Sequence, residues 1–163
     1  MTHYETLQSK ILNNESLPEK LKAWHEAGKK IVFTNGCFDL LHLGHIDYLS
    51  KAADCGDVFI IGVNSDASVR KLKGEHRPIQ DENSRSRILA ALSFVTAVIV
   101  FTEETPYELI KIIQPDVLVK GADYKVEQIA GHDIVLAKGG EVILIDFLSG
   151  YSTSAIEKKI REA

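Results

Sequence analysis

Two histidines stand three residues apart in the segment KIVFTNGCFDLLHLGH, which covers residues 30–45. His42 and His45 lie where a loop gives way to a helical pattern of apolar residues. A spacing of three places both side chains on one face of the first helical turn. That turn has unpaired backbone N–H groups and the positive end of a helix dipole, and Gly44 lets a bulky group approach the backbone. These features predict an anion site with two titratable donors, suited to polyphosphate.

Other interpretations of the pair are a partial metal site or two unrelated polar residues at a helix start. Metal ligation lacks a third histidine or cysteine ligand at an obvious spacing. The apolar run before the pair, and the turn expected at residues 34–36, favour the phosphate site. Asp39 is expected either to cap this turn or to orient a histidine, and Cys37 to be a small packing residue with backbone contacts.

Strand-like apolar runs alternate with helical patterns along the rest of the chain, which predicts an α/β fold. The expected architecture is a Rossmann-like, doubly wound parallel sheet of about five strands in one domain, with a helical lead-in at residues 1–29 and a core at residues 30–160. The strands are predicted at residues 30–34, 58–63, 97–101, 116–120 and 141–145. Ligands of such sheets bind beyond the carboxyl ends of the strands, where the strand order reverses.

The helical patterns carry further expectations. Ile11 and Leu12 are placed in a short N-terminal helix, and Gly56 is expected to end the helix that carries the histidines. Ile88 and Ile160 are expected to face inward from their helices.

Composition narrows the class of protein. The formal net charge of −4 argues against a nucleic-acid-binding surface. The longest apolar runs have the length of strands, so no membrane span is expected, and MTHYETLQSK at the N-terminus has no signal-peptide character. Two cysteines in a well-cored domain predict free thiols in a reducing compartment, the cytoplasm. The dinucleotide-binding glycine fingerprint and the P-loop are absent.

The residues TNGCFDLLHLGH at positions 34–45 resemble the signature of the cytidylyltransferase-like nucleotidyltransferase family. That family carries His-x-Gly-His on a Rossmann-like fold, transfers a nucleoside monophosphate to a phosphate-bearing acceptor, and releases pyrophosphate. The resemblance implies that His42 and His45 serve the α-phosphate region of the nucleotide. It also implies a nucleotide pocket along the same segment, formed by Thr34, Asn35, Gly36, Cys37, Phe38 and Gly44.

A basic loop follows the second predicted strand. In relatives, lysines of this region contact the triphosphate or the acceptor phosphate. The resemblance implies a catalytic role for Lys73, the preferred candidate, and acceptor or phosphate binding for Lys71, the second candidate. Without the resemblance, the loop would be an ordinary solvated surface. An arginine at the place of Arg85 often reaches the acceptor or the phosphates in this family, whereas the alternative is a surface arginine. Asp39 is assigned to the same acceptor or phosphate group.

Two later turns complete the expected site. Residues 121–124 resemble the turn that holds the nucleoside, with Asp123 on the ribose hydroxyls or the metal and Tyr124 near the base. Residues 151–154 resemble the second phosphate-binding motif, which combines hydroxyls with a helix N-terminus. The nucleotide-binding residues expected here are Gly121, Asp123, Tyr124, Ser152, Thr153 and Ser154. The glycerol-phosphate branch has an arginine shortly before this motif, where this chain has residues 146–148, DFL, so positive charge must come from elsewhere.

Residues 115–124, 129–131 and 139–142 resemble the heptose-1-phosphate adenylyltransferase branch, here in stand-alone form. That branch joins ATP and D-glycero-β-D-manno-heptose 1-phosphate into ADP-heptose and pyrophosphate. The resemblance implies Mg²⁺ held through the ATP phosphates without a dedicated protein site, and a homodimer. The alternatives are a glycerol-3-phosphate cytidylyltransferase, an FMN adenylyltransferase and a non-catalytic nucleotide-binding domain.

Overall fold

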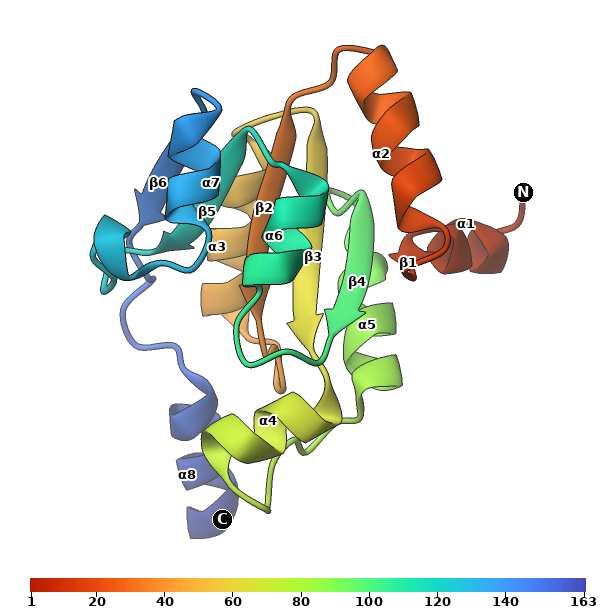
Figure 1. The fold of residues 1–163 in the computed structure, drawn as a ribbon. Coiled ribbons are helices and arrows are strands. Elements are labelled where there is room, and N and C mark those ends of the chain that lie inside the picture. The colour runs from red at the N-terminus through yellow and green to blue at the C-terminus, as the bar shows by residue number, and fades with distance from the viewer.

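The computed structural model describes residues 1–163 and contains one six-stranded sheet in which every neighbouring pair is parallel. The strand order is β1-β4-β3-β2-β5-β6. Helices cover both faces of the sheet, and two further helices lie beyond its carboxyl edge (Figure 1). The α/β, Rossmann-like fold expected from the sequence is confirmed.

The central strands are buried on both faces, as parallel strands between helices must be. All seven residues of β3 are buried, and the apolar residues of β2 are completely inaccessible. The strands are β1 (Ile11–Leu12), β2 (Ile31–Gly36), β3 (Val58–Asn64), β4 (Ala97–Phe101), β5 (Val117–Gly121) and β6 (Glu141–Ile145).

Two hydrophobic clusters lie on opposite faces of the sheet. One joins the strands to α2, α6 and α7, and the other joins them to α3 and α5. The helices are α1 (His3–Ser9), α2 (Leu17–Glu26), α3 (Leu43–Ala53), α4 (Asp66–Lys73), α5 (Glu82–Ala90), α6 (Tyr107–Ile113), α7 (His132–Ala137) and α8 (Thr153–Glu162), with a 3₁₀ turn η1 (Val126–Gln128) before α7.

The sixth strand corrects the expected number of about five. Ile11 and Leu12, which were placed in a helix, form β1 and pair with Val98 and Ile99 of β4. Helical spacing of two apolar residues cannot reveal this pairing, because the partner lies far along the chain. Part of the expected helical lead-in therefore belongs to the sheet.

Three local expectations are also wrong. Residues 34–36, predicted as a turn, continue β2 to its end. Gly56 does not end α3, since the helix ends at Ala53 and Asp54 is its C-cap. Ile88 is 40% exposed and Ile160 67% exposed, so neither faces the core.

The strand order reverses beside β2, in the middle of the sheet. The chain runs from β2 outward through β3 to β4, and then returns to the other side of β2 with β5 and β6. The crevice between the carboxyl ends of β2 and β5 is thus the topological switch point, where ligands of such folds bind. None of the helices is long and apolar enough to cross a bilayer.

Truncation of a central side chain tests this packing. Ile60 of β3 is completely inaccessible, so Ile60→Ala is expected to lower the free energy of unfolding by about 2–5 kcal/mol. Ile88→Ala, which removes the same atoms from the outer face of α5, is expected to change it by less than about 1 kcal/mol. Urea denaturation of both variants measures the difference, and equal losses would contradict the assigned faces.

Candidate active site

A cavity of about 510 Å³ opens at the switch point. It is lined by residues from the ends of β2, β3 and β5 and from the segments that follow them. The expected site residues that it brings together are Asn35, Gly36, Cys37, Phe38, Asp39, His45, Lys73, Gly121, Tyr124 and Thr153. Their roles toward a ligand remain predictions.

The two histidines form a stacked pair at the start of α3. Their ring centroids lie 3.9 Å apart with the planes at 24°, and His42 is the N-cap residue of the helix. Phe38 packs edge-on against His45, at 5.5 Å between centroids. Gly44 is needed here because a Cβ on it would come within 3.0 Å of the His42 ring. The space at Gly44 is therefore used by the protein and is not open to a ligand.

The histidine rings are poised as neutral donors. Burial, and secondarily the charge of a protonated His42, lower the pKa of His45 to about 4. Burial also lowers the pKa of His42. The Nδ1 atom of each ring is buried and has no hydrogen-bond partner. Both rings are thus uncharged at neutral pH, and their Nδ1 atoms are shielded from solvent.

The segment between β2 and α3 bends sharply. Phe38 has a φ of +48°, a left-handed conformation that is uncommon outside glycine. Its ring lies so close to Gly36 that a Cβ there would meet it at 2.9 Å. Burial raises the pKa of the Cys37 thiol, which fits a packing residue and not a nucleophile.

Asp39 holds a neighbouring loop in place. Its carboxylate accepts hydrogen bonds from the amides of Ile79 and Gln80 and pairs with Arg77 at 2.7 Å. Burial alone would raise the pKa of Asp39, but these donors together hold it below its usual value. Asp39 thus positions this loop in the free protein, and its expected role toward the acceptor or a phosphate stays a prediction.

Arg85 also positions neighbouring segments and is buried, contrary to the alternative of a surface arginine, while its expected role toward the acceptor or the phosphates stays a prediction. It is 1% exposed, and its guanidinium donates to the carbonyl oxygens of Cys37, Asn64 and Gln80 and pairs with Asp66 at 2.7 Å. The guanidinium therefore has no free edge toward the cavity. The helical periodicity of the sequence could not show that Arg85 is buried whereas Arg87, on the same helix, is exposed.

The two loop lysines occupy different places. Lys73 lines the main cavity, whereas Lys71 lines a smaller neighbouring one. Lys73 has no ion pair or hydrogen bond from its side chain, so its charge is available to a ligand. The preference for Lys73 over Lys71 thus agrees with the placement of the two side chains.

Lys120 is a residue that the sequence reasoning missed. It lies at the end of β5, lines the cavity, and donates a hydrogen bond of 3.3 Å to the carbonyl oxygen of Asn35. Burial lowers its pKa to about 8, although Cys37 and Asp123 act in the opposite direction. The sequence feature that could have identified Lys120 is a lysine near the end of an otherwise apolar strand, directly before a glycine. The cavity is completed by Tyr48, Asn64, Leu72, Arg77, Glu104 and Phe147, which were also not predicted.

Several expected residues lie outside the cavity wall. Thr34 is buried in the core, where its hydroxyl bonds Tyr48 and the carbonyl oxygen of Val119. Ser152 caps α8 by accepting a hydrogen bond from the Ala155 amide. The full set that does not line the cavity is Thr34, His42, Gly44, Lys71, Arg85, Asp123, Ser152 and Ser154.

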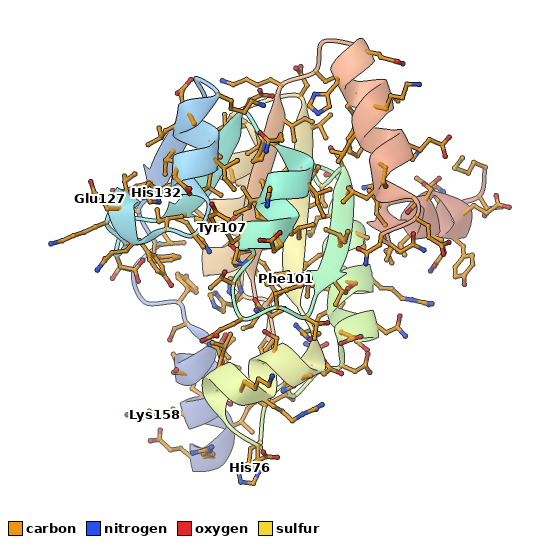
Figure 2. All side chains as sticks on the ribbon, viewed as in Figure 1. His76, Phe101, Tyr107, Glu127, His132 and Lys158 are labelled. Carbon is orange, nitrogen blue, oxygen red and sulfur yellow. The ribbon has the colours of Figure 1, made fainter.

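The remaining ionisable groups do not form a metal centre. No cluster of three or more histidine, cysteine, aspartate or glutamate side chains could hold an ion. Figure 2 shows His76 and His132 on separate parts of the molecule.

The family model and the relatives that this chain resembles agree on one protein family. The cytidylyltransferase-like family model matches residues 33–159. The chain is 54% identical over 160 residues to "Bifunctional protein HldE" of Wolinella succinogenes, covering 98% of this chain and 33% of the relative. It is 59% identical over 140 residues to the protein of the same name from Nitratiruptor sp., covering 86% and 29%. The chain thus spans about a third of the length of these curated relatives.

Two solved structures are similar. One is the lipopolysaccharide core biosynthesis protein from Thermoplasma volcanium, with a TM-score of 0.61 and 31% identity, covering 77% of this chain and all of the other. The other is pantoate-beta-alanine ligase from Francisella tularensis, with a TM-score of 0.60 and 20% identity, covering 94% and 78%. The second shows likeness of fold alone.

The burial of Arg85 predicts an effect on stability. Arg85→Met leaves Asp66 and three carbonyl groups without their donor, so the free energy of unfolding is expected to fall by about 3–5 kcal/mol. Arg87→Met, at the exposed neighbouring position, is expected to change it by about 0.5 kcal/mol or less. Chemical denaturation measures both, and a stable Arg85→Met protein with altered substrate binding would support the ligand role instead.

The pKa of His45 predicts a dependence of stability on pH. Between pH 6.5 and about 4 the unfolded chain binds a proton at His45 that the folded protein does not, so stability falls as the pH falls. In His45→Gln, the decrease in the free energy of unfolding between pH 6.5 and about 4 is expected to be smaller by up to about 3 kcal/mol. Denaturation at a series of pH values measures it, with His25→Gln on the exposed face of α2 as the control. Parallel curves for His45→Gln and the wild type would contradict the burial of a neutral imidazole.

Proposed function

The chain belongs to the cytidylyltransferase-like family of nucleotidyltransferases, and we propose that it transfers AMP from ATP to D-glycero-β-D-manno-heptose 1-phosphate, giving ADP-heptose and pyrophosphate. The observation that carries the transfer chemistry is the stacked pair of desolvated histidines at the start of α3, beside a cavity at the switch point. The heptose acceptor is supported by the identity to the HldE proteins. By this proposal the chain corresponds to the nucleotidyltransferase part of those longer relatives.

The reaction is an in-line displacement. An oxygen of the acceptor phosphate attacks the α-phosphorus of ATP, and the bond from that phosphorus to the bridging oxygen of the β-phosphate breaks as pyrophosphate leaves. The protein needs no covalent intermediate for this step. It must align the two phosphates and stabilise the charge that grows on the transferred group and the leaving group.

The site residues fit those two tasks. His45 lines the cavity and is neutral at working pH, so it offers an N–H to the α-phosphate region without cationic charge. His42 is also neutral and supports His45 by stacking on its ring. Lys73 adds a free positive charge from the end of α4. Thr153 begins α8 at the cavity wall, where unpaired backbone N–H groups face an anion favourably. Mg²⁺ bound with ATP would neutralise part of the phosphate charge.

The nucleoside is assigned to the turn after β5. Gly121 and Tyr124 line the cavity there, and the Tyr124 ring is 46% exposed, so it is available for stacking on a base. Asp123 is exposed beside them and could reach ribose hydroxyls only after the turn closes on a ligand.

The assembly and the location are further parts of the proposal. A homodimer is supported by exposed apolar side chains on the segment from β6 to α8, which include Phe147 and Ile160. A cytoplasmic site of action is supported by the two free cysteines and by the use of ATP.

Loss of one donor tests the histidine assignment. His45→Ala is expected to lower turnover at least about 100-fold while the melting temperature stays near that of the wild type, because single transition-state donors contribute on the order of 3 kcal/mol. His25→Ala is the matched control. The measurement is pyrophosphate release, and near-normal release by His45→Ala would remove this pair from the mechanism.

The same assay tests the substrates. ATP, CTP and GTP are each offered with heptose 1-phosphate, glycerol 3-phosphate and FMN. Release with ATP and heptose 1-phosphate alone is the expected result. Release with CTP and glycerol 3-phosphate would keep the chemistry and replace the acceptor, and nucleotide binding without release in any combination would leave a non-catalytic domain.

A further inference from the structure

Lys120 lies in the crevice where the strand order reverses. It is the fourth of the five residues of β5, and β5 is hydrogen-bonded to β2 on one side and β6 on the other. Side chains alternate between the faces of a strand, so Lys120 projects on the same face as the buried Leu118. Its cross-strand neighbour in β6 is Leu144. An apolar strand therefore ends in a lysine at the place where this fold binds ligands.

The ammonium group of Lys120 has more donors than the protein uses. It has three N–H groups, and the only hydrogen bond is the 3.3 Å contact with the Asn35 carbonyl oxygen. The Tyr124 ring centroid lies 5.7 Å away, and no carboxylate is within ion-pair distance. A desolvated ammonium with one neutral acceptor is incompletely satisfied.

The other cations of the cavity differ from Lys120. Arg77 is paired with Asp39 at 2.7 Å and with Glu157 at 2.9 Å, so its charge is already compensated. Lys73 is unpaired, but it is exposed to solvent. Lys120 is thus the half-buried cation of the cavity that lacks an anionic partner.

Asn35 fixes the position of the ammonium group. Its backbone oxygen accepts the hydrogen bond from Lys120, and the residue lines the cavity, although its side-chain Oδ1 is shielded from solvent. The wall thus presents a cation with free donors. The phosphate group of a sugar phosphate complements it.

We propose that Lys120 forms a phosphate subsite of the cavity, in which its ammonium group, held by the backbone carbonyl of Asn35, binds a phosphoryl oxygen of a sugar phosphate. This assignment rests on the proposed function and deepens it. The phosphate can belong to the nucleotide or to the acceptor, and both sources share the chemistry that Lys120 recognises. Burial strengthens the interaction, because charges attract more strongly where water is excluded.

The contacts of Lys120 also distinguish this role from a structural one. Its ammonium group makes one 3.3 Å hydrogen bond and no ion pair, so the fold loses little when the group is removed. Lys120→Met removes the charge and keeps an unbranched side chain of similar length. The melting temperature of this variant at pH 7 is expected to equal or exceed that of the wild type.

The experiment compares four full-length proteins: the wild type, Lys120→Met, Lys120→Arg and the control Lys111→Met, which alters an exposed lysine of α6. Calorimetry measures the binding of a non-hydrolysable ATP analogue alone, and then of heptose 1-phosphate with the analogue present. Pyrophosphate release gives kcat and KM for each substrate.

Lys120→Met is expected to weaken one binding step by about 10-fold to 100-fold, the range for a charged hydrogen bond. Weaker binding of the ATP analogue would assign the contact to the nucleotide phosphates, and weaker binding of heptose 1-phosphate alone would assign it to the acceptor. Lys120→Arg is expected to recover part of the loss, and Lys111→Met to bind both ligands as the wild type does.

Binding of both ligands by Lys120→Met within about threefold of the wild type would overturn the subsite. A melting temperature reduced in parallel with a binding loss that Lys120→Arg does not relieve would assign Lys120 to structure instead. Absence of turnover in the wild type would reject the proposed function alone. The calorimetric comparison of the wild type with Lys120→Met would still decide the role of Lys120. A wild type that binds neither ligand would overturn both proposals.

Discussion

The buried guanidinium of Arg85 holds together the segments that form the cavity. Through its four partners it joins the turn after β2, the end of β3, the start of α4 and the segment that precedes α5. Asp39 completes this arrangement by binding Arg77, Ile79 and Gln80. Loops at the carboxyl edge of a sheet are otherwise free to move, so these buried ionic contacts hold the loops that line the cavity.

Much of the framework follows from local patterns in the sequence. Continuous apolar runs define β3, β4 and β6 nearly to the residue, and the segment with His42 and His45 identifies both the helix start and the switch-point strand before it. These signals succeed because burial on both faces of a parallel strand and the composition of a helix start are properties of a few adjacent residues. The site lies where the fold rule for parallel sheets places it.

The remaining features depend on contacts between distant residues. Strand β1 exists because Ile11 and Leu12 meet β4. Arg85 and Arg87 have the same chemistry and neighbouring positions, yet only Arg85 turns toward three carbonyl groups from other segments. Lys120 belongs to the cavity because its ammonium group contacts Asn35 near the end of β2, a contact that the sequence of its own strand does not indicate. A single sequence contains these residues but not the distances between them.

The charge state of the cavity bears on the proposed binding of polyphosphate. At neutral pH the desolvated histidines are uncharged, whereas Lys120, whose pKa burial lowers to about 8, keeps most of its charge. A phosphate favours the protonated form of each neighbouring group and thus raises its pKa. Binding and protonation therefore reinforce each other, and a nucleoside without phosphates gains neither. The burial that makes these groups costly to charge in the free protein is the same burial that strengthens their interaction with the substrate.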